Sequence, residues 1–136
     1  MAASDSGNLS LVSVIVPNYN HAPFLKERID SVLNQTYQNL ELIILDDCSN
    51  DSSSDIINEY RNHPKISHIE FNKKNTGSPF QQWQKGIHLA KGKWIWIAES
   101  DDYADIKFLE KVIKENKNNE EVSLFFCKSS VIDATG

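Results

Sequence analysis

The sequence WIWIAESDDY, residues Trp94–Tyr103, sets an apolar run directly against a cluster of acids. Its first five residues are apolar, and the next four positions contain Glu99, Asp101 and Asp102. A short apolar run rich in aromatic and β-branched residues predicts a buried strand. Acids placed directly after such a strand belong to a turn, to the cap of the next helix, or to a metal site.

Outward from this stretch, strand and helix patterns alternate along the chain. Apolar runs predict further strands, and apolar positions at helical spacing predict helices between them. The predicted strands are 11–16, 40–45, 66–71, 94–98 and 122–127, and the predicted helices are 22–35, 51–61, 79–90 and 105–117. The order β-α-β-α-β-α-β-α-β is typical of a parallel sheet covered on both faces. We therefore predict an α/β fold, a three-layer α/β/α sandwich with a mostly parallel central sheet.

Three polar clusters each follow a predicted strand: Pro17–Asn20, Asp46–Asp47 and Glu99–Asp102. In parallel sheets, ligands bind beyond the carboxyl ends of the strands. The three clusters, far apart in sequence, are therefore expected to converge on one edge of the sheet.

Crowded carboxylates repel one another, and the pKa of one of them rises strongly. A hard divalent cation, Mg²⁺ or Mn²⁺, would relieve the repulsion by binding carboxylates together with substrate phosphates. The alternative is that the acids cap helices. Asp46–Asp47 alone is more typical of a turn and cap, and Asp105 is predicted to be an N-cap.

Composition places the chain among ordinary globular proteins. It has 136 residues, 40% hydrophobic and 24% charged, which predicts one domain. The net charge of −5 argues against a general nucleic-acid binder. Cys48 and Cys127 form no C-x-x-C pair, so we expect buried thiols in a reducing cytoplasm, with a disulfide as the alternative. Residues 1–10 carry no signal-peptide pattern and predict a disordered leader, and no apolar run is long enough to span a membrane.

Four motifs, in this order and spacing, resemble those of the family 2 glycosyltransferases. They are VIVPNYN (14–20), SVLNQTY (31–37), LELIILDDCSNDSS (40–53) and GKWIWIAESDDY (92–103). The resemblance covers residues 11 to about 133. It implies a GT-A fold, in which a Rossmann-like nucleotide-binding half precedes an acceptor-binding half. Residues 11–136 are then expected to be the nucleotide-sugar-binding part, with the acceptor-binding half absent.

The same resemblance implies an activity. A sugar would pass from a nucleotide-diphosphate donor, UDP or dTDP by preference, to the hydroxyl of a saccharide or lipid-linked acceptor, with inversion and with Mg²⁺ or Mn²⁺. The family setting is polysaccharide synthesis in the cytoplasm, with peripheral association at the inner face of the membrane. The general base is expected beyond Gly136. A non-catalytic nucleotide-binding module is the alternative.

The resemblance assigns the nucleotide to residues after the first two strands. Pro17 and Tyr19 would line the base pocket, Pro17 with its carbonyl and Tyr19 with its ring. Asp47 would accept a hydrogen bond from the base, and a uracil or thymine N–H is the natural donor. Asp46 is the less suited of the two acids, and we keep it as a candidate for cofactor binding.

The resemblance assigns the metal to the acidic turn. Asp101 would be a ligand, and Asp102 either a second ligand or a helix cap. Glu99 stands where the family usually has aspartate, and it would reach ribose hydroxyls or a metal-bound water. Nearby aromatic and imidazole groups have simpler interpretations: Trp83 is expected to pack in the core, and His21 to lie on a turn surface.

Overall fold

The structure, a computed structural model, describes residues 9–119, 121–125 and 129–133. Helices and strands alternate along these residues, which confirms the predicted order as far as the fourth helix. The elements are β1 (Val12–Asn18), α1 (Ala22–Leu33), β2 (Leu40–Asp46), α2 (Ser53–Glu59), β3 (Ile66–Phe71), α3 (Pro79–Leu89), β4 (Trp94–Ile97) and α4 (Phe108–Lys117).

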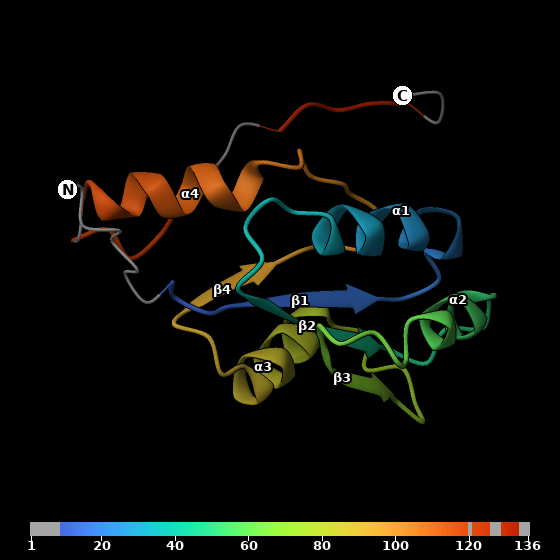
Figure 1. Ribbon diagram of the computed structural model, residues 1–136. Coiled ribbons are helices and arrows are strands. Elements are labelled where there is room, and N and C mark those ends of the chain that lie inside the picture. Colours follow the sequence, from blue (N-terminus) through green and yellow to red (C-terminus); the bar gives the residue numbers. More distant parts are fainter. Residues whose placement is uncertain (1–8, 120, 126–128, 134–136) are drawn as a thin grey trace.

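The strands form one sheet in the order β3-β2-β1-β4, and every neighbouring pair is parallel. Figure 1 shows α1 and α4 on one side of this sheet and α3 on the other. The predicted three-layer α/β/α sandwich is therefore confirmed. None of the helices in the described ranges has the length and apolar character that crossing a membrane requires.

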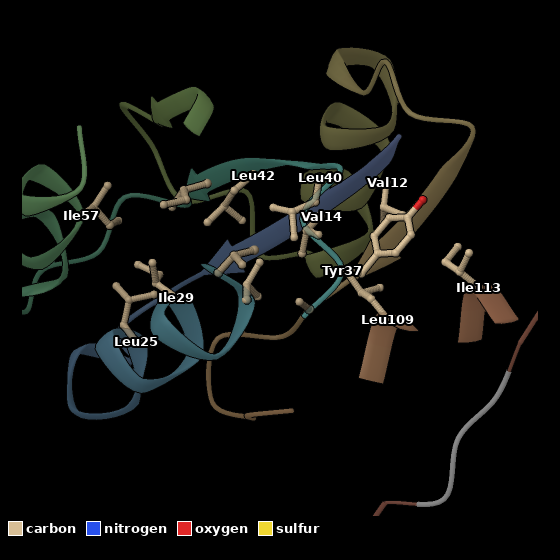
Figure 2. Packing of buried hydrophobic residues seen from close by; sticks show 14 residues of the cluster. Val12, Val14, Leu25, Ile29, Tyr37, Leu40, Leu42, Ile57, Leu109 and Ile113 are labelled. Atoms are coloured by element: carbon tan, nitrogen blue, oxygen red, sulfur yellow. The ribbon is translucent and has the colours of Figure 1, made fainter. Parts of the chain in front are cut away.

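Alternation along the strands divides the core between the two faces of the sheet. Successive side chains of a strand point to opposite faces. Val12, Val14 and Val16 of β1 join the larger cluster, which packs against α1, α2 and α4 (Figure 2). Ile15 lies on the opposite face, in the smaller cluster beside α3. Because β1 is buried on both faces, successive residues Val14, Ile15 and Val16 are all apolar and do not alternate with polar ones.

The predicted fifth strand, 122–127, is wrong for the part that the structure describes. Residues 122–125 form no strand, and residues 126 and 127 lie outside the described ranges. The ring of Phe125 packs edge-on against Trp94 of β4, with ring centroids 5.6 Å apart, while Leu124 is 67% exposed. The apolar pattern correctly indicated contact with the sheet, but contact through one ring does not require ladder hydrogen bonds.

The predicted N-cap at Asp105 is also wrong. Helix α4 begins at Phe108, and its N-cap residue is Lys107. The Asp105 carboxylate instead accepts a hydrogen bond from the Lys107 N–H at 2.9 Å, in the turn before the helix. Asp102 lies still further from α4, so the helix-cap alternative for Asp102 is wrong as well.

Close packing between α3 and β1 gives a first prediction. A Cβ atom at Gly86 would stand 2.5 Å from Cγ2 of Ile15, which is fully buried. Gly86→Ala is therefore expected to lower the free energy of unfolding by about 1–2 kcal/mol, even though alanine favours helix. Urea denaturation measures this, with Gln84→Ala on the exposed face of α3 as control. Unchanged stability of Gly86→Ala would contradict the packing.

Candidate functional site

A cleft begins where β1 continues past the end of β4. The pairing of β1 with β4 ends at Ile15 and Ile97, whereas its pairing with β2 continues to Asn18 and Asp46. Proline lacks the N–H that a central strand donates, and Pro17 lies in the stretch that β4 no longer pairs. In the sheet, β2 lies on one side of β1 and β4 on the other, so the strand order reverses at β1. Ligands bind at such a switch point in open α/β sheets.

The cleft has a volume of about 340 Å³ and receives residues from four parts of the chain. It brings together Pro17, Tyr19, Asp47 and Glu99, four of the residues that the sequence assigned to the nucleotide. Its lining consists of Pro17, Asn18, Tyr19, His21, Asp47, Asn75, Gly77, Ser78, Pro79, Gln82, Glu99 and Ser100. The ends of β1, β2 and β4 thus meet the start of α3 at one edge of the sheet.

Asp47 is buried, with only 4% of its surface exposed, and its carboxylate holds the segment before α3. Asn72 donates to it at 2.8 Å, the Thr76 hydroxyl at 2.8 Å and Gln82 at 3.1 Å. The Thr76 N–H also donates to both oxygens, at 3.0 and 3.1 Å. Burial acts to raise the pKa of Asp47, but the hydrogen bonds from Asn72 and Thr76 outweigh it and hold the pKa below its ordinary value.

Asp46 faces the turn after β1 and does not line the cleft. Its carboxylate accepts hydrogen bonds from Asn18 Nδ2 at 2.7 Å and from Ser49 Oγ at 2.6 Å. The Ser49 N–H donates to its other oxygen at 2.9 Å. The two neighbouring acids therefore organise two different segments, Asp46 the turns after β1 and β2, and Asp47 the approach to α3.

Glu99 lies at the start of the acidic turn and is tied to α3. Its Oε1 accepts a hydrogen bond from Trp83 Nε1 at 2.9 Å. Burial raises the pKa of Glu99, and the negative charges of Asp101 and Asp102 raise it further. Trp83, expected in the core, is only half-buried and uses its indole N–H beside the cleft.

Arg28 of α1 is a buried cation beneath the acidic turn, and the sequence analysis did not identify it. It is 3% exposed, and its Nε donates to the Glu99 carbonyl at 2.7 Å. Its Nη2 lies 3.8 Å from Asp102, and its guanidinium lies over the Trp96 ring at 5.6 Å. Arg28 follows Leu25 by three positions on the buried face of α1, so helical spacing could have identified it.

His21 also contributes to the cleft, although the sequence favoured a turn surface. Its Nδ1 forms a 2.7 Å hydrogen bond with the hydroxyl of Ser100. Ser100 is buried and both residues line the cleft. This contact joins the turn after β1 to the turn after β4.

The acidic turn fits one kind of metal site and not another. The described residues contain no group of three or more His, Cys, Asp or Glu side chains that could hold a metal ion. Asp101 and Asp102 are exposed, and the charges of both act on Glu99. Mg²⁺ and Mn²⁺ often take only one or two carboxylates and complete their coordination with substrate phosphates. The turn fits an ion bound in that way and does not fit an ion held by protein side chains alone.

The motif SVLNQTY holds the segment after the acidic turn against α1. Gln35, 1% exposed, donates from Nε2 to the Asp105 carbonyl at 2.8 Å, and its Oε1 accepts from the Leu109 N–H at 2.9 Å. The Thr36 N–H donates to the Ile106 carbonyl at 2.9 Å. The motif therefore positions the acidic turn without lining the cleft.

Gln35→Met is expected to lower the free energy of unfolding by about 2 kcal/mol, because the buried Leu109 N–H loses its acceptor while the side-chain volume is kept. Chemical denaturation measures the loss. Gln81→Met, at an exposed position of α3, is the control and should stay within about 0.5 kcal/mol of the wild type. Equal losses in the two variants would show that Gln35 does not hold this segment.

The chain matches known proteins over nearly its whole length. A model of the family described as Glycosyl transferase family 2 matches residues 13–132. An uncharacterized glycosyltransferase of Methanocaldococcus jannaschii is 37% identical over 128 residues, which cover 93% of this chain and 44% of that protein. The chain thus spans less than half the length of this relative.

Two solved structures are similar in fold. S. aureus TarS 1–349, solved in complex with UDP and with UDP-GlcNAc, has a TM-score of 0.74 and 27% identity, and the match covers 80% of this chain and 32% of that one. The mannosyltransferase PcManGT from Pyrobaculum calidifontis, in complex with GDP-Man and Mn²⁺, has a TM-score of 0.60 and 26% identity. That match covers 68% of this chain and 28% of PcManGT.

Proposed function

This chain belongs to glycosyl transferase family 2 and has the GT-A fold of that family, and on this basis we propose that it forms the donor-binding part of a glycosyltransferase. The cleft at the switch point between β1 and β4 is the observation that carries the proposal. It joins an aromatic side chain, a buried carboxylate and the beginning of a helix in about 340 Å³. This volume lies within the range of about 300–1,000 Å³ that is typical of small-molecule pockets, and we expect it to accept a nucleotide.

The nucleoside would occupy the end of the cleft near Pro17, Tyr19 and Asp47. Tyr19 is 46% exposed and can offer its ring to a base. UDP and dTDP are the favoured carriers, because the family resemblance places the imino N–H of a uracil or thymine base at Asp47. TarS, which binds UDP and UDP-GlcNAc, supports the same class of donor.

The diphosphate would lie toward the acidic turn and the start of α3. Asp101, and Asp102 beside it, would hold Mg²⁺ or Mn²⁺ together with the diphosphate oxygens. Such an ion neutralises the negative charge of a diphosphate leaving group. Glu99 would face the ribose or a water near the ion. The Mn²⁺ found with GDP-Man in PcManGT supports this choice of ions.

The reaction would be an inverting transfer. The bond between the anomeric carbon and the diphosphate oxygen breaks, the acceptor oxygen forms the new bond, and its proton passes to a general base. We expect that base in a part of the protein beyond residue 136. The acceptor would be a saccharide or a lipid-linked saccharide at the inner face of the membrane, as the family resemblance implies.

Calorimetry of UDP, dTDP and GDP binding, with and without Mn²⁺, tests the proposal. We expect UDP or dTDP to bind more tightly than GDP, and Mn²⁺ to strengthen binding. A chain that binds none of the three nucleotides with Mn²⁺ present would disprove a donor-binding function. Binding without transfer by a longer form of the protein would instead favour a non-catalytic nucleotide-binding module.

A further inference from the structure

Charge is distributed unevenly along this chain. Residues 71–98 contain five lysines and no arginine, aspartate or glutamate, so this stretch has a formal charge of +5. Because the whole chain has a net charge of −5, all the other residues together carry −10. The basic stretch runs from the last residue of β3 through α3 to just past β4. A basic region built around α3 therefore stands against a strongly acidic remainder.

Most of these lysines are available to a partner. Lys85 of α3 is already paired with Glu70. The other four are exposed and lie in the segments that enter and leave α3: Lys73, Lys74, Lys91 and Lys93. None of the four forms an ion pair with a residue that the structure describes. Uncompensated positive charge therefore lies at both ends of α3.

Exposed apolar side chains lie between these two pairs of lysines. Gln82 and Gly86 form the buried side of α3. Phe80 and Ile87 are seven residues apart, so they share a face of the helix, and they are 67% and 49% exposed. Ile95 of β4 alternates with residues that join the cluster beneath α1 and α4, so it points to the α3 side of the sheet, and it is 42% exposed.

These exposed groups lie on the α3 side of the molecule, opposite α1 and α4 (Figure 1). We call this surface the α3 face, and it consists of Lys73, Lys74, Phe80, Ile87, Lys91, Lys93 and Ile95. It combines positive charge with large apolar side chains and contains no acid. Exposed apolar groups that are framed by charges of one sign are typical of an interaction surface.

A flat anionic partner fits this distribution better than an extended one. A bilayer with anionic headgroups would attract the lysines of the α3 face and repel the acidic remainder, so the charges would also orient the molecule. Aromatic and aliphatic side chains among lysines enter the boundary between headgroups and acyl chains. A nucleic-acid strand that continued beyond the α3 face would meet the negative charge of the remaining residues.

We propose that the α3 face docks on the surface of a membrane that contains anionic lipids. Gly77, Ser78 and Pro79 line the cleft directly before Phe80, so a bilayer on this face would lie beside the mouth of the cleft. A lipid-linked acceptor would then reach the donor without leaving the membrane. This purpose rests on the proposed function, whereas docking itself is measured without any nucleotide.

Flotation with vesicles tests the docking of this chain. We expect binding to vesicles of equal parts phosphatidylcholine and phosphatidylglycerol to be at least about tenfold tighter than binding to pure phosphatidylcholine, and to weaken as salt is added. The double variant Lys91→Gln, Lys93→Gln should weaken binding to the anionic vesicles by about 30-fold. Lys114→Gln with Lys117→Gln makes the same change in net charge at exposed positions of α4, on the other side of the sheet, and should bind like the wild type.

A second pair of variants tests the apolar contribution. Ile87→Ala should weaken binding to the anionic vesicles by about tenfold, because a side chain that enters the headgroup boundary is shortened. Ile106→Ala is the control, since Ile106 is 51% exposed but lies just before α4. Equal losses in the two variants would show that Ile87 does not enter the bilayer and would overturn the α3 face as the docking surface.

The remaining outcomes decide between partners. Equal binding to anionic and neutral vesicles, or binding to neither, overturns the inference. So does a single-stranded RNA oligonucleotide that binds in place of vesicles and loses affinity in Lys91→Gln, Lys93→Gln, because the face would then serve a nucleic acid. A longer form of the protein that binds no vesicles also overturns it, since the rest of the protein would then cover the face. Failure to bind UDP in the absence of vesicles contradicts the proposed function alone.

Discussion

Replacing Asp47 with alanine is expected to lower the affinity for UDP by about 100-fold or more and the free energy of unfolding by about 3 kcal/mol. The side chain receives hydrogen bonds from Asn72, Thr76 and Gln82. Its loss leaves these donors, of which Gln82 is buried, without their acceptor, and it releases both the segment before α3 and the amide of Gln82. Calorimetry with UDP and urea denaturation measure the two effects. Asp55→Ala, an exposed acid of α2, is the control for the change in net charge.

The pH dependence separates the charge of Asp47 from its shape. Because the pKa of Asp47 is lowered in the folded state, its ionised form contributes stability above the unfolded pKa of about 3.9. That contribution disappears as the pH falls from about 4 through the lower folded pKa. Asp47→Asn does not titrate, so its stability deficit relative to the wild type should shrink over that range. A deficit that stays constant down to the end of the range would show that the charge contributes nothing.

Replacing Asp101 with alanine is expected to remove the part of UDP affinity that depends on Mn²⁺, a loss of about 100-fold, with the fold intact. Asp101 is exposed on the acidic turn, so its removal costs little stability. Calorimetry of UDP with and without Mn²⁺ gives the metal-dependent difference directly, and thermal unfolding checks the fold.

Asp102→Ala is the matched comparison for Asp101. Its carboxylate already lies 3.8 Å from Arg28, so its loss should reduce the Mn²⁺ effect less than the loss of Asp101 does. If Asp101→Ala keeps the full Mn²⁺ effect, the assignment of Asp101 as a ligand fails. A larger loss in Asp102→Ala than in Asp101→Ala would reverse the order of the two acids.

The sequence predicted the sheet well because its central strands are buried on both faces. The predicted strand 40–45 and the observed β2 differ by one residue, and Pro17 did not end β1 because β4 no longer pairs with it there. The strand predicted at 122–127 was wrong for residues 122–125 because an apolar pattern indicates burial but does not indicate a neighbouring strand to pair with. The start of α4 was misplaced because an acid before a helix can bond to a turn as readily as to the first N–H groups of the helix.

The sequence predicted those residues of the candidate site whose place depends on backbone topology. It did not predict side-chain hydrogen bonds between residues that are far apart in the sequence. Asp47 and Glu99 follow strand ends, and Pro17 lies at the carboxyl end of β1, so parallel topology alone brings them together. The pairing of Gln82 with Asp47 joins residues 35 positions apart, and no local pattern encodes it. Arg28 was hidden in an amphipathic helix, where a charged residue on the apolar side is the only signal.

The acidic turn is held at both ends, by α1 and by the segment that follows α1. Arg28 binds the Glu99 carbonyl where the turn begins, and Gln35 binds the Asp105 carbonyl where it finishes. The backbone of the acidic turn therefore loses its conformational entropy when the protein folds, and not when a ligand binds. Under the proposed function, an incoming ion would meet carboxylates on a backbone that is already ordered, and the binding entropy should reflect released water more than a newly ordered chain.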